Sequence, residues 1–211
     1  MVQYILLFVT FQILFLVIYD VFLKRETFFQ WNRVYLIVTF LVSLVLPFVK
    51  IAAFTTVVPE QFSTIVLQEI VLTPNNTEVA TSFSLIQLLF FAGMTISFLV
   101  FGFKIYQLLK LKKQGQSQKF RDYIKVIIPK SNVAFSFYNT VFLGDAVNQE
   151  SEKGILEHEL VHIRQKHTLD LLFFEVMRIV FWFNPLVYVY QQRIAELHEF
   201  IADAHVGKDN R

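Results

Sequence analysis

Three long runs of apolar residues occupy the first half of the chain. Residues 2–22, 34–49 and 83–103 are almost free of charged side chains. A helix rises about 1.5 Å per residue, so each run approaches or reaches the ~30 Å thickness of the hydrocarbon core of a bilayer. The pattern predicts a membrane domain over residues 1–103, with three transmembrane helices and an outer loop over residues 50–82.

The cationic residues predict the orientation of these helices. Lys24, Arg25 and Arg33 lie between the first and second runs. The third run is followed by a group of lysines, Lys104, Lys110, Lys112, Lys113 and Lys119. The outer loop has Lys50 alone against three glutamates. By the positive-inside rule, the N-terminus lies outside and everything after the third run lies in the cytoplasm, as expected for a multi-pass protein of the bacterial inner membrane.

The pattern changes after residue 103. Residues 104–121 are rich in Lys and Gln, which predicts a basic cytoplasmic linker helix broken at Gly115, and residues 122–211 are expected to form a cytoplasmic domain. Within it, residues 123–129 predict a strand and residues 133–144 a hairpin turning at Tyr138-Asn139. The hairpin edge either binds an extended substrate as an added strand or only packs the next helix; both readings stay open.

Composition excludes several other classes of protein. The chain is 55% hydrophobic and only 17% charged, with 25 Phe, which agrees with an integral membrane protein. It has no cysteine, so disulfides, a cysteine zinc site and thiol catalysis are all excluded. No basic face with interleaved aromatic residues is present, so direct binding of nucleic acid is not expected.

The most specific chemical signal is His158-Glu159-Leu160-Val161-His162, an H-E-x-x-H motif with apolar flanks. On a helix, two histidines four residues apart project from the same face and can take two corners of a tetrahedral Zn²⁺ site. Glu159 is displaced around the helix, where its carboxylate can act as catalytic base toward a water molecule. The pattern indicates the catalytic helix of a zinc peptidase.

A catalytic zinc site needs a third protein ligand and one open position. The candidates all lie after the motif: His167, Asp170, Glu175, Glu196, His198, Glu199, Asp203 and His205. Glu199 and Asp203 share a helix face, so Glu199 is the expected ligand and Asp203 the expected acceptor of a free histidine N–H. Glu196, on nearly the same face, is the fallback ligand. If Glu199 is the ligand, Glu196 is expected beside the ligands together with Asp203. His198 and His205 are expected at the surface. No residue is assigned to oxyanion stabilisation, for which Arg193 and His205 are the candidates.

Residues 169–190 are apolar enough to suggest a fourth membrane span. A crossing there would carry Glu199 to the far side of a ~30 Å core from His158 and His162, so the three could not bind one ion. The Asn184-Pro185 break offers an alternative, because the residue before a proline is biased away from helix. We therefore expect residues 169–204 to form a helical hairpin packed in the cytoplasmic domain, partly sunk into the inner membrane face.

The ordered motifs resemble those of the BlaR/MecR-type membrane metallopeptidases, the antirepressor signal transducers of bacteria. The likeness covers essentially the whole chain and is carried by His158-Glu159-Leu160-Val161-His162-Ile163-Arg164, Phe183-Asn184-Pro185-Leu186-Val187 and Glu199-Phe200-Ile201-Ala202-Asp203. It implies a mainly α polytopic protein whose three helices precede a gluzincin-like α+β peptidase domain. It also implies Zn²⁺ on His158, His162 and Glu199, with Glu159 as base. The implied substrate is a cytoplasmic protein, typically a transcriptional repressor, cut in response to an external signal.

Three alternatives stay open. Members of this family usually continue into a fourth span and an external sensor domain, whereas this sequence stops at Arg211; it is either truncated or a sensorless relative, and a β-lactam ligand is not carried over. A more distant resemblance is to the HtpX-type membrane proteases, which degrade misfolded membrane proteins. The alternative from another class is a non-catalytic signalling or scaffold protein, whose closed structural metal site would use His198 or His205 as fourth ligand.

Overall fold

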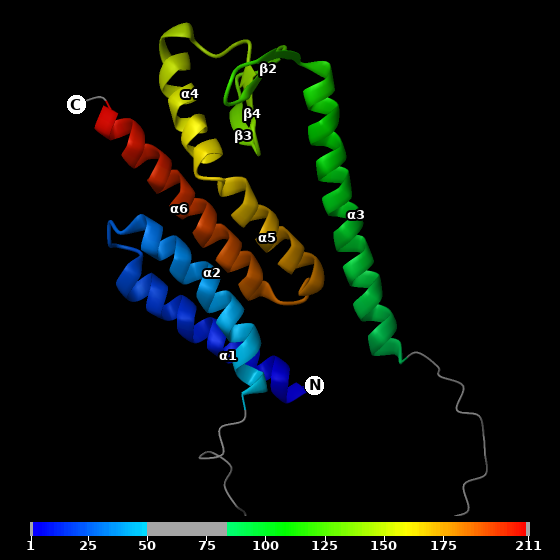
Figure 1. Ribbon diagram of the computed structural model, residues 1–211. Coiled ribbons are helices and arrows are strands. Elements are labelled where there is room, and N and C mark those ends of the chain that lie inside the picture. The colour runs from blue at the N-terminus through cyan, green and yellow to red at the C-terminus, as the bar shows by residue number, and fades with distance from the viewer. Residues whose placement is uncertain (1, 50–83, 210–211) are drawn as a thin grey trace, which may run out of the picture.

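The computed structural model describes residues 2–49 and 84–209 and is mostly helical (Figure 1). The outer loop expected over residues 50–82 therefore lies outside the described residues. The elements in chain order are α1 (Val2–Ile18), the π-helix η1 (Tyr19–Leu23), α2 (Phe29–Val45), the 3-10 helix η2 (Leu46–Phe48), α3 (Leu85–Gln114), β1 (Gln116–Lys119), β2 (Ile124–Ile128), β3 (Ala134–Phe137), β4 (Thr140–Gly144), α4 (Gln149–Arg164), α5 (His167–Val180) and α6 (Pro185–Asp209).

Three helical segments are long and apolar enough to cross a membrane: Gln3–Leu23, Phe29–Phe48 and Leu85–Gln114. Their mean hydropathies are 2.4, 1.6 and 2.1, so the three predicted helices of membrane-spanning length and hydropathy are present. The second helix begins earlier than expected, at Phe29, and the third continues as one helix to Gln114. Lysine and glutamine are good helix formers, so nothing stops α3 before Gly115.

The predicted linker helix over residues 104–121 is only partly correct. Its first half is the end of α3, but Gln116–Lys119 form the edge strand β1, which pairs antiparallel with β2. The chain changes from α3 to β1 at Gly115. A glycine is needed there because a Cβ would overlap the Val126 side chain and lie 2.8 Å from the Ile127 carbonyl oxygen. The strand was missed because four exposed polar residues carry no β signal; pairing with β2 decides their structure.

A small sheet lies between the end of α3 and α4 (Figure 1). Its strand order is β1-β2-β4-β3, with β2 and β4 parallel and the other pairs antiparallel. The strand over residues 123–129 and the hairpin turning at Tyr138-Asn139 are both confirmed. Val126, Ile128 and Phe142 form its core against α3, and β3 is left as an edge strand beside α4.

The expected helical hairpin is present as α5 and α6, joined by residues 181–184. α5 has 14 residues and is therefore about 21 Å long, too short to cross a bilayer core. At the tip, the Asn184 side-chain amide donates a 2.8 Å hydrogen bond to Gln12 Oε1, with both residues buried. Gln12 lies near the middle of the Gln3–Leu23 segment, so the hairpin extends about halfway along α1.

One hydrophobic core joins the hairpin to the first two membrane helices. α6 lies between the α1–α2 pair and the α4–α5 pair (Figure 1). The Phe40 ring of α2 meets Phe173 and Phe174 of α5 and Tyr190 of α6 at centroid distances of 5.4–5.9 Å. The hairpin thus packs against membrane helices, not only within residues 122–211 as expected, and the division of the chain into domains stays a prediction.

Candidate metal centre

α4 and α6 bring three potential ligands together beside this core. His158 and His162 project from one face of α4, and Glu199 reaches them from α6. The Glu199 side chain is 62% exposed. His158 Nε2 lies 3.2 Å from His162 Nε2 and 3.3 Å from Glu199 Oε2, and His162 Nε2 lies 3.7 Å from Glu199 Oε1. The three residues predicted as ligands therefore form one cluster.

The spacing of these donors fits a metal ion. Two atoms that each lie ~2.0–2.1 Å from one tetrahedral zinc ion are about 3.3 Å apart. The three observed separations, of which the two to Glu199 involve different oxygens of its carboxylate, lie within a few tenths of an ångström of that value. One donor atom from each residue lies within 4.8 Å of the other two. Two imidazole nitrogens and a carboxylate oxygen are also the donor types that zinc accepts, so the cluster could hold such an ion with one position left open.

Each histidine of the pair has a partner at its other ring nitrogen. His158 Nδ1 lies 3.1 Å from Asp203 Oδ1, one turn after Glu199 on α6, which is the position expected for Asp203. His162 Nδ1 lies 2.8 Å from Nδ1 of His167, the first residue of α5. These contacts leave the two Nε2 atoms facing each other and Glu199, as a metal ligand requires.

The expectation that His198 lies at the surface is wrong. Its side chain is buried and stacks on His167, with ring centroids 3.9 Å apart and planes 3° from parallel. Its Nε2 lies 2.9 Å from Asp170 Oδ2, which also accepts a 2.6 Å hydrogen bond from Arg33 Nε. α6 is covered on this face by α5, which its local sequence does not reveal. His205 is exposed, as expected.

Burial shifts the pKa values of the groups behind the cluster. It lowers the pKa of His162, and it lowers the pKa of His167 to about 2, with His198 adding to the effect. Burial would raise the pKa of Asp170, but hydrogen bonds from His198 and Arg33 hold that pKa below its ordinary value. His162 and His167 are therefore neutral at neutral pH and Asp170 is charged, as their hydrogen bonds require.

Glu159 lies next to the cluster but outside it. Its side chain is 9% exposed and hydrogen-bonds to the Ser136 side chain of β3. Burial raises the pKa of this carboxyl group. A pocket of about 260 Å³ opens in front of it, with Ala134, Phe135, Ser136, Glu159, His162, Leu171, Ala195, His198 and Glu199 as its lining. A molecule in this pocket would therefore contact the base candidate, two cluster residues and β3 together.

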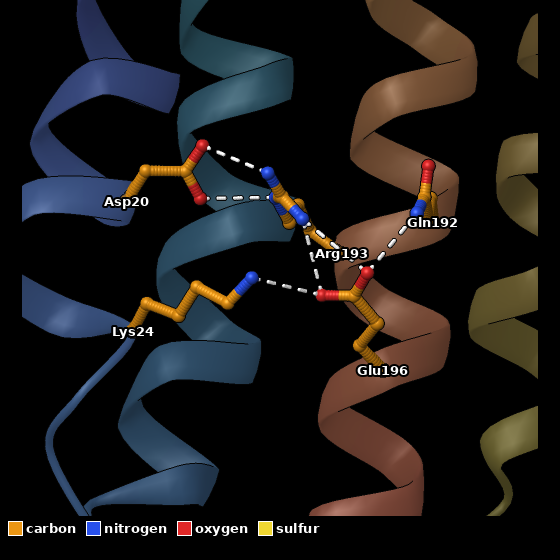
Figure 2. A network of polar contacts seen from close by, with 5 residues as sticks. All are labelled: Asp20, Lys24, Gln192, Arg193 and Glu196. Carbon is orange, nitrogen blue, oxygen red and sulfur yellow. Dashed lines mark hydrogen bonds and ion pairs between the residues drawn. The ribbon is translucent and has the colours of Figure 1, made fainter.

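The fallback ligand Glu196 lies elsewhere, which corrects that part of the prediction. Figure 2 shows its carboxylate in a network with Lys24, Gln192 and Arg193, where Lys24 Nζ lies 3.2 Å from Oε2. Arg193 is also paired with Asp20 of η1 at 2.9 Å and so is turned away from the pocket. This network attaches α6 to the end of the first membrane helix.

Three other ligand candidates also have partners outside the cluster or donate no ligand atom to it. Glu175 accepts hydrogen bonds from Lys104 of α3, Arg178 and Gln191, at 2.7–3.0 Å. The Asp170 carboxylate is hydrogen-bonded to Arg33 and His198. His167 supports His162 through its ring nitrogen instead of joining the cluster. The sequence signal for these roles was weak: charged and histidine side chains in apolar helices, with no indication of their partners.

Comparison with known proteins does not assign the chain. No family model matches it, and no curated protein matches it. Its function is therefore argued from the geometry of the site and from its motifs.

Proposed function

We propose that the protein is an integral membrane zinc-dependent endopeptidase with a gluzincin-like catalytic domain, which cleaves a cytoplasmic protein during transmembrane signalling. The observation that carries this proposal is the spacing of His158, His162 and Glu199, with the buried carboxylate of Glu159 beside them. The resemblance to the BlaR/MecR-type peptidases adds a substrate class, a transcriptional repressor. The cationic residues after the third membrane helix support a cytoplasmic site.

The roles of the residues follow from their positions. Zinc bound to this cluster would supply a Lewis acid that polarises the scissile carbonyl and makes water more acidic. Glu159, oriented by Ser136, takes a proton from the attacking water and later delivers it to the leaving amine. Asp203 holds the His158 ring in the orientation that keeps its Nε2 directed toward the cluster.

The sheet edge supports the binding of an extended substrate. In an antiparallel pair of strands, hydrogen-bonded residue pairs alternate with non-hydrogen-bonded pairs. Gly144 N–H donates to the Val133 carbonyl, so the N–H and C=O groups of Ala134 and Ser136 point away from β4. Both residues line the pocket with Glu159. A substrate paired with this free edge would pass directly over the cluster, which favours substrate binding over mere packing as the role of β3.

Ala134→Pro tests this use of the edge. Proline removes the N–H that faces the substrate and leaves the bonds to β4 intact, and edge strands tolerate proline. We expect kcat/KM for a protein substrate to fall about three- to tenfold, the worth of one hydrogen bond, with unchanged zinc content. Ala134→Ser keeps the N–H and is the matched control. Equal kcat/KM for the two variants would rule out strand pairing at this position.

A second candidate, a signalling or scaffold protein with a structural metal site, needs a fourth protein ligand. Within the described residues, the cluster contains three donors. Of the two residues suggested for the fourth position, His198 is bonded to Asp170, and His205 lies 3.0 Å from the Ile201 carbonyl oxygen of its own helix. The geometry thus favours an open site and an enzyme.

Metal removal is the direct test of the proposed function. Protein purified in detergent should contain about one zinc per chain and cleave a cytoplasmic substrate; a chelator should stop cleavage and added zinc should restore it. His162→Ala should lose both zinc and activity, whereas the exposed His205→Ala should keep its zinc. Zinc retained without any cleavage would favour the scaffold function. Cleavage of many unfolded membrane proteins would favour the HtpX-like alternative.

A further inference from the structure

A chain of four polar side chains, three of them buried, lies behind His162. It consists of His167 on α5, His198 on α6, Asp170 on α5 and Arg33 on α2. His167 and His198 are each 1% exposed and Asp170 is 9% exposed. Polar groups buried this deeply cost free energy unless each has a partner, so their arrangement needs a physical explanation.

The protons of the two adjacent histidines follow from the geometry. With His162 Nε2 directed at the cluster as a ligand, its ring proton must be on Nδ1. That nitrogen lies 2.8 Å from His167 Nδ1, so His162 donates and His167 accepts. His167 then carries its own proton on Nε2, a buried nitrogen without a hydrogen-bond partner among the described residues. The ring behind His162 is therefore a neutral acceptor, whereas the group behind His158 is the carboxylate of Asp203.

Three residues, His198 on α6, Asp170 on α5 and Arg33 on α2, hold the His167 ring in place. The ring is stacked flat on His198, whose Nε2 lies 2.9 Å from Asp170 Oδ2. Arg33 donates to the same oxygen and, through Nη2, donates a 3.0 Å bond to the Gln165 carbonyl between α4 and α5. The stack fixes the plane of the His167 ring, and within that plane the contact with His162 selects the orientation in which Nδ1 faces His162.

We propose that His167 is a positioning residue for metal binding: its Nδ1 accepts the His162 Nδ1–H, and the stacked His198, bound through Asp170 to Arg33, keeps that acceptor in place. The inference rests on the proposed zinc site and extends it to a residue that donates no ligand atom. It also makes the start of the second membrane helix part of the support of the site, because Arg33 belongs to α2.

Two variants of His167 separate the acceptor from the ring. His167→Phe keeps an aromatic ring on His198 but has no acceptor. His167→Asn loses the ring, but its Oδ1 takes the place of Nδ1 on the same carbon. We expect His167→Phe to weaken zinc binding about 10- to 100-fold in competition with a fluorescent chelator, and His167→Asn to restore most of the affinity. His205→Phe, on an exposed histidine, should bind zinc as the wild type does.

The outcomes distinguish this inference from the proposed function. A wild-type protein that binds no zinc contradicts the proposed function itself. Wild-type zinc affinity in His167→Phe, or equal losses in the Phe and Asn variants, contradicts only the role of His167 as acceptor.

A measurement on the zinc-loaded wild-type protein does not depend on the folding of a variant. Nitrogen-15 NMR of the histidine rings should show His167 protonated on Nε2 and His162 on Nδ1. A His167 proton on Nδ1 would overturn the inference.

Discussion

Glu159→Gln is expected to abolish peptidase activity while zinc stays bound. Glutamine has the same shape and can still hydrogen-bond to Ser136, but its amide cannot take a proton from water. Because Glu159 is not one of the three donors of the cluster, the donor set remains complete. Loss of general acid–base catalysis should reduce the cleavage rate about 10²- to 10⁴-fold, measured on a protein substrate with zinc content determined in the same samples.

Glu157→Gln is the matched control for this variant. Glu157 is on the same helix, is partly exposed and lies 3.9 Å from Lys153, so its replacement should change neither cleavage nor zinc content. A Glu159→Gln protein that cleaves at the wild-type rate would show that another group is the base. A variant that loses its zinc would show that Glu159 is a ligand.

Asp170→Ala is expected to cause the largest loss of stability. It leaves the guanidinium of Arg33, 17% exposed, and the buried His198 without their common partner. Removing one member of a largely buried ion pair typically costs about 3–5 kcal/mol, because the remaining charge is left uncompensated. We expect a reduction of that order in the free energy of unfolding, measured by denaturant titration in detergent micelles.

Two further variants show whether the lost pair causes this effect. Asp122→Ala removes an exposed carboxylate and should leave the free energy of unfolding within about 0.5 kcal/mol of wild type. The double variant Arg33→Met/Asp170→Leu removes both charges and should recover much of the stability that Asp170→Ala loses. Wild-type stability of Asp170→Ala would mean that Arg33 and His198 find other partners.

The parts of the structure that sequence could predict are local or constrained by chemistry. The apolar runs predict α1, α2 and α3, and the four-residue spacing of His158 and His162 places both on one face of α4. The helical hairpin followed from a chemical constraint, since Glu199 can join the histidines only if the chain turns back before it. The Asn184-Pro185 break supplied the position of that turn.

What sequence missed depends on contacts between distant segments. The stack of His198 on His167 is set by how α5 and α6 pack, and no periodicity within either helix encodes it. The partners of Asp170 include Arg33, which is separated from it by most of the chain. The polar strand β1 likewise exists only because β2 offers a partner. Pairings of this kind need three-dimensional information.

The Gln12–Asn184 hydrogen bond has a consequence for the surrounding lipid. With α1, α2 and α3 crossing a bilayer, the bond holds the tip of the α5–α6 hairpin near the midplane, because separating two amides in hydrocarbon leaves both unpaired. The described helices then occupy a larger cross-section in the leaflet beside the metal cluster than in the opposite leaflet. Such a wedge-shaped body displaces lipid unequally from the two monolayers and should favour membrane regions that curve to accommodate it.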